Sequence, residues 1–219
     1  MSVVSLQVCS NCTRVYVERP MMDEFLDHLV RATEKLKIGD PADPETTVGA
    51  TISPEHAARV LSYIEDAKKE GARVLCGGQR VTPADPNLSR GHYLSPCVLA
   101  DCTDDMRVVR EEVFGAVASV LPFDTEEEAL RRANDSPFGL AAGVMTRDLR
   151  RAHRVARRLQ AGIVWINNFN VLPAGVPFGG YKMSGYGREN GLAALQAYSQ
   201  EKAVYVEMAD QVDCPLYKL

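Results

Sequence analysis

Long apolar segments, a basic excess and a secretory leader are all missing from this sequence. The longest apolar stretches, at 139–145 and 161–166, fall far short of the roughly 20 residues that a membrane-spanning helix needs. The formal net charge of −4 argues against nucleic acid or an anionic membrane as a partner, because both select basic surfaces. The first residues combine no basic region with an apolar run. We therefore expect a small molecule or another protein as partner, and a cytoplasmic location.

The six cysteines do not have the distribution of a disulfide framework. They are scattered through a mid-sized chain, so most are expected to be buried small hydrophobic residues. Cys9 and Cys12 form a Cys-x-x-Cys pair, which by spacing alone fits a redox dithiol or half of a zinc site. However, Cys12 leads into a strand pattern, and the only loose second pair, Cys97 and Cys102, has no histidine partner. We expect no metal.

Strand and helix patterns alternate along most of the chain. Residues 13–18 alternate as a strand does, and residues 21–37 carry apolar side chains at helical spacing. Ser53, followed by a proline, predicts the start of a helix that runs to about residue 70. The other expected elements are strands at 73–76, 93–100, 117–123, 140–145, 162–167 and 202–207, and helices at 124–134, 148–160 and 192–197. This alternation predicts an α/β fold with a mostly parallel sheet flanked by helices.

Two segments carry residues suited to chemistry. Cys9 stands in a polar turn just before the first expected strand, where a thiolate can act as a nucleophile once its pKa is lowered. A buried thiol without a catalytic role is the plainer interpretation of such a cysteine. Residues 177–191 contain five glycines, which suits either a loop that shapes an active site or an ordinary surface turn.

Four segments occur in the order in which the aldehyde dehydrogenase superfamily has them. They are Gln-Val-Cys-Ser-Asn at 7–11, Glu-Glu-Val-Phe-Gly at 111–115, Phe-Gly-Leu-Ala-Ala at 138–142 and the glycine-rich stretch at 177–191. The chain resembles this superfamily from residue 6 onward, and looks most similar to its trimethylaminobutyraldehyde and betaine-aldehyde branch. The resemblance implies an NAD(P)-dependent oxidoreductase that converts an amino- or trimethylamino-aldehyde to the acid. NAD is the expected cofactor, with NADP as the alternative.

The resemblance also implies roles for individual residues. Cys9 would attack the aldehyde to give a thiohemiacetal, hydride would pass to the nicotinamide, and water would hydrolyse the thioester. Glu112 matches the glutamate that binds the nicotinamide ribose, and Phe114 matches the aromatic residue that packs against the cofactor. His56 falls where the family sometimes touches the adenosine ribose, although a surface histidine on a helix is the plainer interpretation.

Aromatic residues near the C-terminal end are candidates for the aldehyde pocket. Phe178 matches an aromatic position of the family's pocket, and Phe169 and Trp165 lie nearby in sequence. A trimethylammonium group cannot donate hydrogen bonds, so aromatic faces are its natural hosts, each worth about 0.5 to 2 kcal/mol. Core packing is an equally good interpretation of Trp165.

The sequence departs from the family pattern at a few positions. Leu6 and Cys12 stand where the family usually has glycine, and a β-carbon there would crowd the nucleophile turn if the backbone needs a positive φ. Ala50 and Ala116 replace prolines, which should cost little beyond loop stiffness.

The resemblance implies a catalytic domain at 1–197 followed by an oligomerisation strand and tail at 198–219. The family's dinucleotide-binding domain, general-base glutamate and oxyanion-binding asparagine all precede the cysteine, where this sequence has eight residues. We therefore expect that domain to be absent and the isolated chain to be inactive or severely impaired. The expected partners are a small aldehyde and either further copies of the chain or full-length subunits.

Two other functions stay open. The chain can be a truncated, non-catalytic subunit that associates with a full-length aldehyde dehydrogenase, in which case it should expose a large apolar surface. A weaker hypothesis is a thiol hydrolase, in which Cys9 cleaves activated esters without a cofactor.

Overall fold

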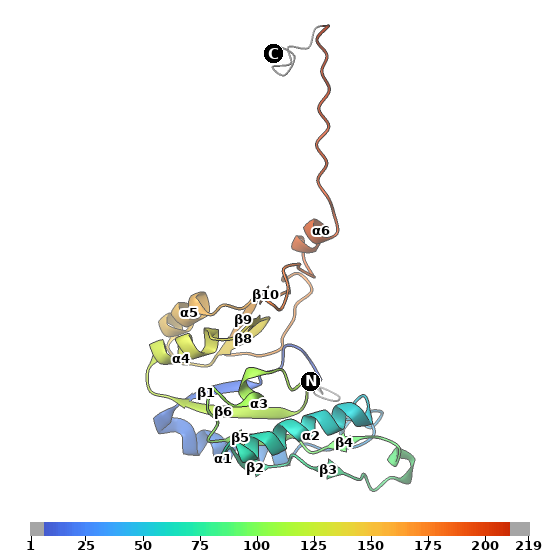
Figure 1. Ribbon diagram of the computed structural model, residues 1–219, viewed down its shortest axis with the longest axis vertical. Helices are drawn as coiled ribbons and strands as arrows, with labels where there is room; N and C mark the ends of the chain where they lie inside the picture. Colours follow the sequence, from blue (N-terminus) through green and yellow to red (C-terminus); the bar gives the residue numbers. More distant parts are fainter. Residues whose placement is uncertain (1–6, 211–219) are drawn as a thin grey trace.

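A four-stranded sheet forms the centre of the molecule in the computed structural model, which describes residues 7–210 (Figure 1). Its strands, in spatial order, are β1 (Arg14–Glu18), β6 (Val117–Phe123), β5 (Cys97–Ala100) and β2 (Arg73–Cys76). β6 is parallel to both of its neighbours, while β2 pairs antiparallel with β5. The predicted α/β fold with a mostly parallel sheet is confirmed. Of the four strands of this sheet, only the edge strand β2 is antiparallel to its neighbour.

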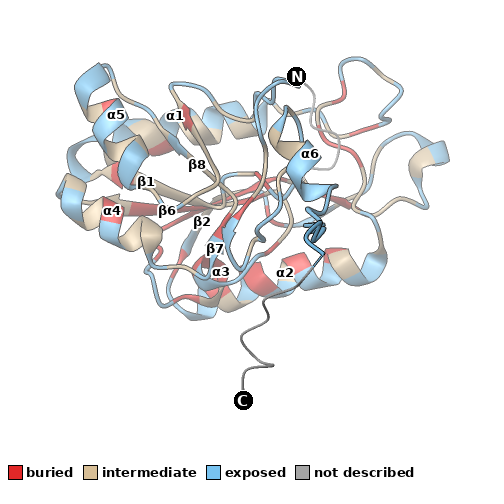
Figure 2. Cartoon of the chain, turned by 90° about the horizontal axis from the view of Figure 1, so that it is seen from above, coloured by how far each residue is buried: buried red, intermediate tan, exposed pale blue. Residues whose placement is uncertain are grey.

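Each face of this sheet is covered by one long helix. Helix α2 (Pro54–Lys69) buries its apolar side against Leu99 and Leu121, and α1 (Met22–Glu34) packs on the opposite face against Val98. Successive residues of a strand point to opposite faces, which is why neighbours such as Val98 and Leu99 belong to different cores. Figure 2 shows buried residues along β6 and on the inner side of α2.

A second group of elements lies beside the central sheet. β8 (Ala141–Val144) and β9 (Ile163–Ile166) form a parallel pair that is connected through α5 (Leu149–Arg158), and α4 (Glu126–Asn134) packs against α5. The short elements are η1 (Arg19–Met21), β3 (Arg80–Val81), η2 (Pro86–Leu88), β4 (Tyr93–Leu94), α3 (Arg107–Arg110), β7 (Phe138–Gly139), β10 (Tyr181–Lys182) and α6 (Ala193–Ala197). The sequence patterns did not predict α3 or β10.

Helices α2, α4 and α5 each begin at a polar residue whose side chain accepts a hydrogen bond from a backbone amide of the first turn. Ser53 accepts from the His56 amide at α2, and Asp148 caps α5 in the same way. At α4 the cap is Thr125, one residue later than the predicted start. Each such cap is worth about 1 kcal/mol. None of the helices within residues 7–210 is long and apolar enough to cross a membrane.

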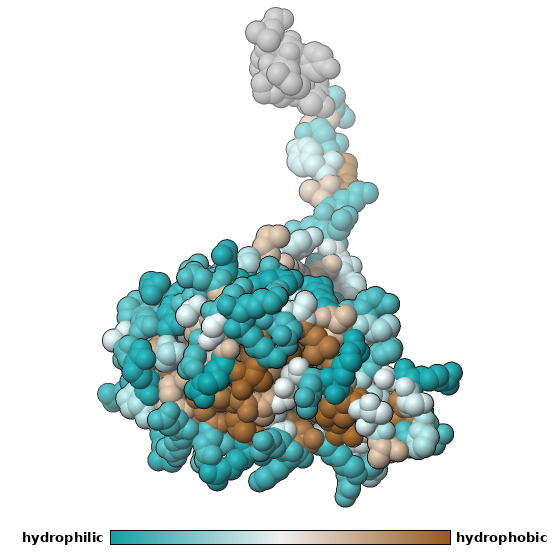
Figure 3. All heavy atoms as spheres, turned by 60° about the horizontal axis from the view of Figure 1, so that its bottom comes forward, coloured by the Kyte–Doolittle hydropathy of each residue, from teal (hydrophilic) through white to brown (hydrophobic). Residues whose placement is uncertain are grey.

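The C-terminal segment leaves the body of the molecule. After α6, residues 201–208 run as exposed, extended chain, and the predicted strand at 202–207 has no β partner within residues 7–210. Its pairing with another chain stays a prediction. The body itself shows apolar surface gathered in the middle of one face, surrounded by hydrophilic side chains (Figure 3).

Candidate active site

Cys9 lies in an exposed turn immediately ahead of β1. The turn is closed by the Asn11 amide, which donates to the Val8 carbonyl oxygen over 3.1 Å, and the Cys9 side chain reaches solvent. Cys97 and Cys102 are instead buried in the core, where loss of hydration raises their pKa to about 12 and about 11. Because the thiolate is the reactive form, an exposed thiol is the better nucleophile of the three.

Cys12 does not strain the turn. Its backbone lies outside the left-handed region, so the side chain that replaces the family's glycine fits without penalty. The residue is exposed as a whole, but its sulfur donates to the Arg14 carbonyl oxygen, and desolvation raises the pKa of the thiol to about 11. Cys12 leads into a strand, as the sequence indicated, and Leu6 lies outside the described residues.

The sheet topology brings distant motifs to the same edge of the sheet. β1 and β6 are parallel neighbours, so both strands begin at the same edge of the sheet. The turn that carries Cys9 precedes β1, and Glu112–Phe114 precede β6. The nucleophile candidate and the cofactor candidates therefore share one edge, although about a hundred residues separate them in sequence.

The residues around the start of α2 contact both motifs. The Ile52 amide donates to Gln7 Oε1 over 3.0 Å, and His56 Nε2 lies 2.8 Å from the Phe114 carbonyl oxygen. Because a carbonyl oxygen can only accept, His56 carries its proton on Nε2 in this contact. His56 was expected to be a surface residue, and the structure instead gives it a half-buried bridging position.

Glu112 and Phe114 have the exposure that a cofactor contact requires. Glu112 is exposed and makes no hydrogen bond within residues 7–210, whereas its neighbour Glu111 accepts from Tyr63 over 2.7 Å. Phe114 is half-buried at a φ of 56°, and its ring meets the His56 ring edge-on at 6.3 Å. An exposed acceptor two residues from an aromatic ring fits a ligand that has both hydroxyl groups and a flat ring.

Gly115 allows the chain next to Phe114 to lie close against α2. A β-carbon at Gly115 would lie 2.8 Å from a methyl group of Val60, so only glycine fits there without a shift.

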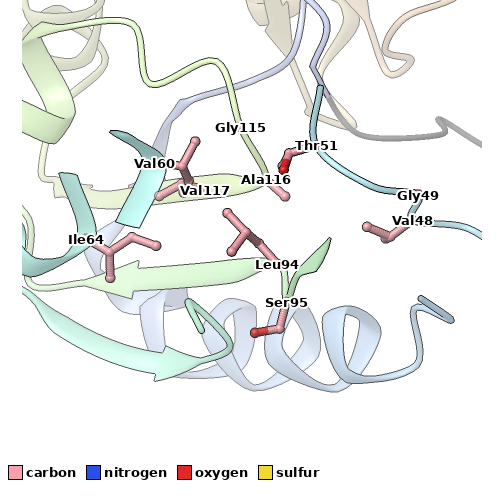
Figure 4. A pocket seen from close by; sticks show the side chains of 10 residues that line it. All are labelled: Val48, Gly49, Thr51, Val60, Ile64, Leu94, Ser95, Gly115, Ala116 and Val117. Atoms are coloured by element: carbon pink, nitrogen blue, oxygen red, sulfur yellow. The ribbon is translucent and has the colours of Figure 1, made fainter. Parts of the chain in front are cut away.

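Beside Gly115 is a narrow, mostly apolar hollow between α2 and the strands, lined by Val60, Leu94, Ala116 and others (Figure 4). Its lining has no charged side chain, which makes it a packing gap rather than a cofactor site.

Among the aromatic candidates for the aldehyde pocket, Trp165 and Phe169 contact each other, and Phe178 makes separate contacts. Trp165 is buried, its Nε1 donates to the Val171 carbonyl oxygen, and its ring centre is 4.8 Å from that of Phe169. Trp165 is thus a core residue, while Phe169 stays half-buried. Phe178 pairs through its backbone with Glu189 and closes the glycine-rich segment. No ring contact joins Phe178 to Phe169 in the part of the chain that the structure describes.

Two residues without a predicted role also hold the nucleophile turn. Ser10 is buried and its hydroxyl donates to Asn170 Oδ1 over 2.7 Å, while Asn170 Nδ2 donates to Asn11 Oδ1 over 3.0 Å. An asparagine in a turn after a strand is a recognisable signal for a left-handed backbone, and Asn170 has a φ of 58°. Its contact with Ser10 spans 160 positions, which no spacing rule reveals.

Comparison with known proteins identifies the family of the chain. Residues 2–204 match the model of the aldehyde dehydrogenase family. The chain is 58% identical over 204 residues to 4-trimethylaminobutyraldehyde dehydrogenase B of Danio rerio and 55% identical to the Homo sapiens enzyme. These alignments cover 93% of this chain but only 39% and 41% of the relatives, so the chain spans about two fifths of their length.

Solved structures of aldehyde dehydrogenases resemble this chain as well. A betaine aldehyde dehydrogenase from Staphylococcus aureus, in complex with NAD+, superposes with a TM-score of 0.83 at 43% identity, over 89% of this chain and 38% of that one. A point mutant of an aldehyde dehydrogenase from Bacillus cereus reaches a TM-score of 0.86 at 46% identity, over 93% of this chain and 40% of that one. The chain belongs to the aldehyde dehydrogenase family.

Proposed function

We propose that this chain supplies the nucleophile and part of the cofactor and substrate sites for the NAD-dependent oxidation of an aldehyde to a carboxylic acid. The observation that carries the proposal is the exposed Cys9 thiol in a turn at the sheet edge where Glu112 and Phe114 also lie. The dehydrogenase relatives, and the NAD+ in the Staphylococcus aureus structure, support this reaction class. NADP is the alternative cofactor.

The chemistry divides among a few groups of this chain. The Cys9 thiolate sulfur bonds to the aldehyde carbon, and the carbonyl oxygen takes up the electron pair of the C=O bond, which gives the anion of a thiohemiacetal. NAD+, when bound, supplies the acceptor for the hydride that leaves this carbon. The carbon then remains on Cys9 as a thioester, and water releases the acid and restores the thiol. Glu112 accepts hydrogen bonds from ribose hydroxyls, and Phe114 packs against the cofactor.

The substrate class follows from the aromatic side chains. Phe169 and Phe178 are half-buried, so neither residue is sealed in the core. A trimethylammonium group is held by aromatic faces at about 0.5 to 2 kcal/mol each, because it has no proton to donate. We therefore propose an amino- or trimethylamino-aldehyde as substrate, in agreement with the names of the relatives.

The remaining parts of the enzyme lie outside the matched portion. We propose that residues 1–197 form the catalytic domain and residues 198–219 an oligomerisation strand and tail. We also propose that the general base and cofactor domain, which the resemblance implies, belong to the three fifths of the relatives that this chain does not match. The 219-residue chain by itself should therefore be inactive or severely impaired, since loss of one oxyanion donor alone costs about 10² to 10³ in rate.

The experiment compares the chain alone with a hybrid enzyme. In the hybrid, this chain replaces the matched 204-residue segment of the Danio rerio relative. With 4-trimethylaminobutyraldehyde and NAD, the hybrid should form NADH and the isolated chain should not. Cys9→Ser should abolish NADH formation by the hybrid, whereas Cys12→Ser should retain it. A Cys9→Ser hybrid that keeps its activity would show that the nucleophile lies elsewhere.

A non-catalytic role in a larger assembly is the second candidate. Large apolar side chains are exposed along the C-terminal segment, at Leu192, Tyr198, Val204, Tyr205, Val206 and Met208. Such a segment fits a subunit that associates with full-length aldehyde dehydrogenase chains. Co-purification with a full-length relative, without a change in NADH formation after Cys9→Ser, would favour this candidate over the catalytic one.

A further inference from the structure

The turn that carries Cys9 is fixed on both sides. On the N-terminal side, Gln7 Oε1 accepts from the Ile52 amide over 3.0 Å. On the C-terminal side, the Ser10 hydroxyl donates to Asn170 Oδ1 over 2.7 Å. Val8 and Cys9 lie exposed between these two attachments. The reactive side chain is therefore free while the backbone that presents it is held.

Asn170 uses both ends of its side-chain amide in this attachment. Its Oδ1 accepts from Ser10 and its Nδ2 donates to Asn11 Oδ1, so the two residues after Cys9 are bound to one side chain. Ser10 is only 3% exposed. Without Asn170 its hydroxyl would lose its partner in a place that water barely reaches, and a buried polar group without a partner is unfavourable. The turn is therefore more stable with Ser10 bonded to Asn170 than with this hydrogen bond broken.

Asn170 also links the turn to the aromatic segment. It follows Phe169, whose ring packs against Trp165 and lies over Gly143. Asn170 has a φ of 58°, in the left-handed region that asparagine tolerates better than most residues. On the C-terminal side of Cys9, the attachment of the turn therefore runs through this one side chain.

We propose that Asn170 is a positioning residue, which holds the Cys9 turn so that the sulfur attacks a carbonyl carbon while a backbone amide of the turn faces the oxygen that becomes negative. The proposal rests on the proposed function, in which Cys9 is the nucleophile. Catalysis of this kind is sensitive to geometry, since a displacement of about 1 Å can cost about 10² in rate. A loosened turn should lose carbonyl chemistry and keep the general reactivity of an exposed thiol.

The test compares two reactions of Cys9 in the 219-residue chain, neither of which needs a cofactor. With 4-nitrophenyl acetate, the sulfur bonds to the acetyl carbon through a tetrahedral oxyanion, and nitrophenolate leaves. With iodoacetamide, the sulfur displaces iodide at a CH2 group, and no oxyanion forms. Both rates are measured over a range of pH up to the alkaline plateau, so that a change in the thiol pKa is separated from a change in geometry. Peptide mass spectrometry assigns each product to Cys9.

Asn170→Gly removes the side chain and keeps a residue that accepts the positive φ. Asn167→Gly is the matched control, because Asn167 has a φ of 52° and also makes two side-chain hydrogen bonds of 2.8 Å, both to Thr146. Ser10→Ala removes the donor to Asn170. The double variant Ser10→Ala/Asn170→Gly tests whether the two residues act through one bond.

Asn170→Gly should lower acylation of Cys9 about tenfold and leave its alkylation within about twofold. Asn167→Gly should change neither rate, and the double variant should lose no more acylation than Asn170→Gly alone. A parallel fall in both reactions, an equal loss in Asn167→Gly, or no acylation of Cys9 in the unaltered chain would overturn the proposal. The proposed function fails separately, by NADH formation that survives Cys9→Ser in the hybrid.

Discussion

At the scale of single residues, the environment of each sulfur decides what it can do. Cys9 is exposed in a turn, whereas Cys97 and Cys102 are buried between the sheet and α2. The sequence showed that a cysteine preceded a strand in a polar turn, and the resemblance gave it a role. It could not show which of the other thiols is desolvated, because burial depends on the packing of α2 against β5.

Thiol reactivity should follow this difference. At pH 8, a buried thiol with a pKa of about 11 or 12 is thiolate to about one part in a thousand or less, and it is also shielded from reagent. Iodoacetamide should therefore modify Cys9 well before Cys97 or Cys102, as peptide mass spectrometry can measure over time. Equal rates at Cys9 and Cys97 in the folded chain would contradict the structure.

Gly115 is the residue that lets the chain beside Phe114 approach α2 closely. In Gly115→Ala the new methyl group would meet Val60 at 2.8 Å, so we expect a loss of about 1 to 3 kcal/mol in the free energy of unfolding. Gly187→Ala is the matched control, since a β-carbon there has no neighbour within 4 Å. Thermal and urea unfolding of the two variants check the prediction. A Gly115→Ala chain as stable as Gly187→Ala would mean that α2 can move away at no cost.

At the scale of elements, local patterns predicted most of the helices and strands, and the pairing of strands came only from the structure. Hydrophobic alternation identified β1, a buried apolar run identified β6, and a cap followed by proline identified the start of α2. Nothing in the sequence of β2 indicated that it would be the antiparallel strand of the sheet. The edge shared by Cys9 and Phe114 depends on such pairing, so the site's assembly could not be predicted from motif order alone.

The contact between α4 and α5 should make stability depend on pH. Glu126 accepts two hydrogen bonds of 2.7 Å from Arg154, and this contact lowers the pKa of its carboxyl group. A carboxyl group whose pKa is lowered on folding stabilises the protein above its ordinary pKa, near 4.5, and loses that contribution as the pH falls through the lowered value. Glu126→Gln should therefore cost about 1 kcal/mol at pH 7 and progressively less below pH 4.5.

The control for this measurement is Glu65→Gln, which removes an exposed ion pair with Lys68 on the surface of α2. Exposed pairs of this kind contribute little, so its effect should be small at every pH. Urea unfolding at several pH values measures both variants. A Glu126→Gln deficit that stays constant down to acid pH would show that the loss comes from packing and not from charge.

At the scale of the whole molecule, apolar surface is left uncovered. It lies in the middle of one face of the body and along the extended segment after α6 (Figure 3). We expect the chain to associate through residues 198–219. A chain shortened to end at residue 197 should therefore have a lower mass, as measured by light scattering after size-exclusion chromatography. A shortened chain that associates as strongly as the 219-residue chain would place the contact on the body instead.

The bond between Ser10 and Asn170 also has a consequence for how the molecule is made. It joins residues 160 positions apart, and contacts of such long range form only after the entropy of closing the intervening loop has been overcome. A ribosome releases the Cys9 turn long before residue 170 is synthesised. The nascent chain therefore carries an unrestrained thiol while the 160 positions that separate the two residues are synthesised, and it acquires a fixed nucleophile only after residue 170 has been added.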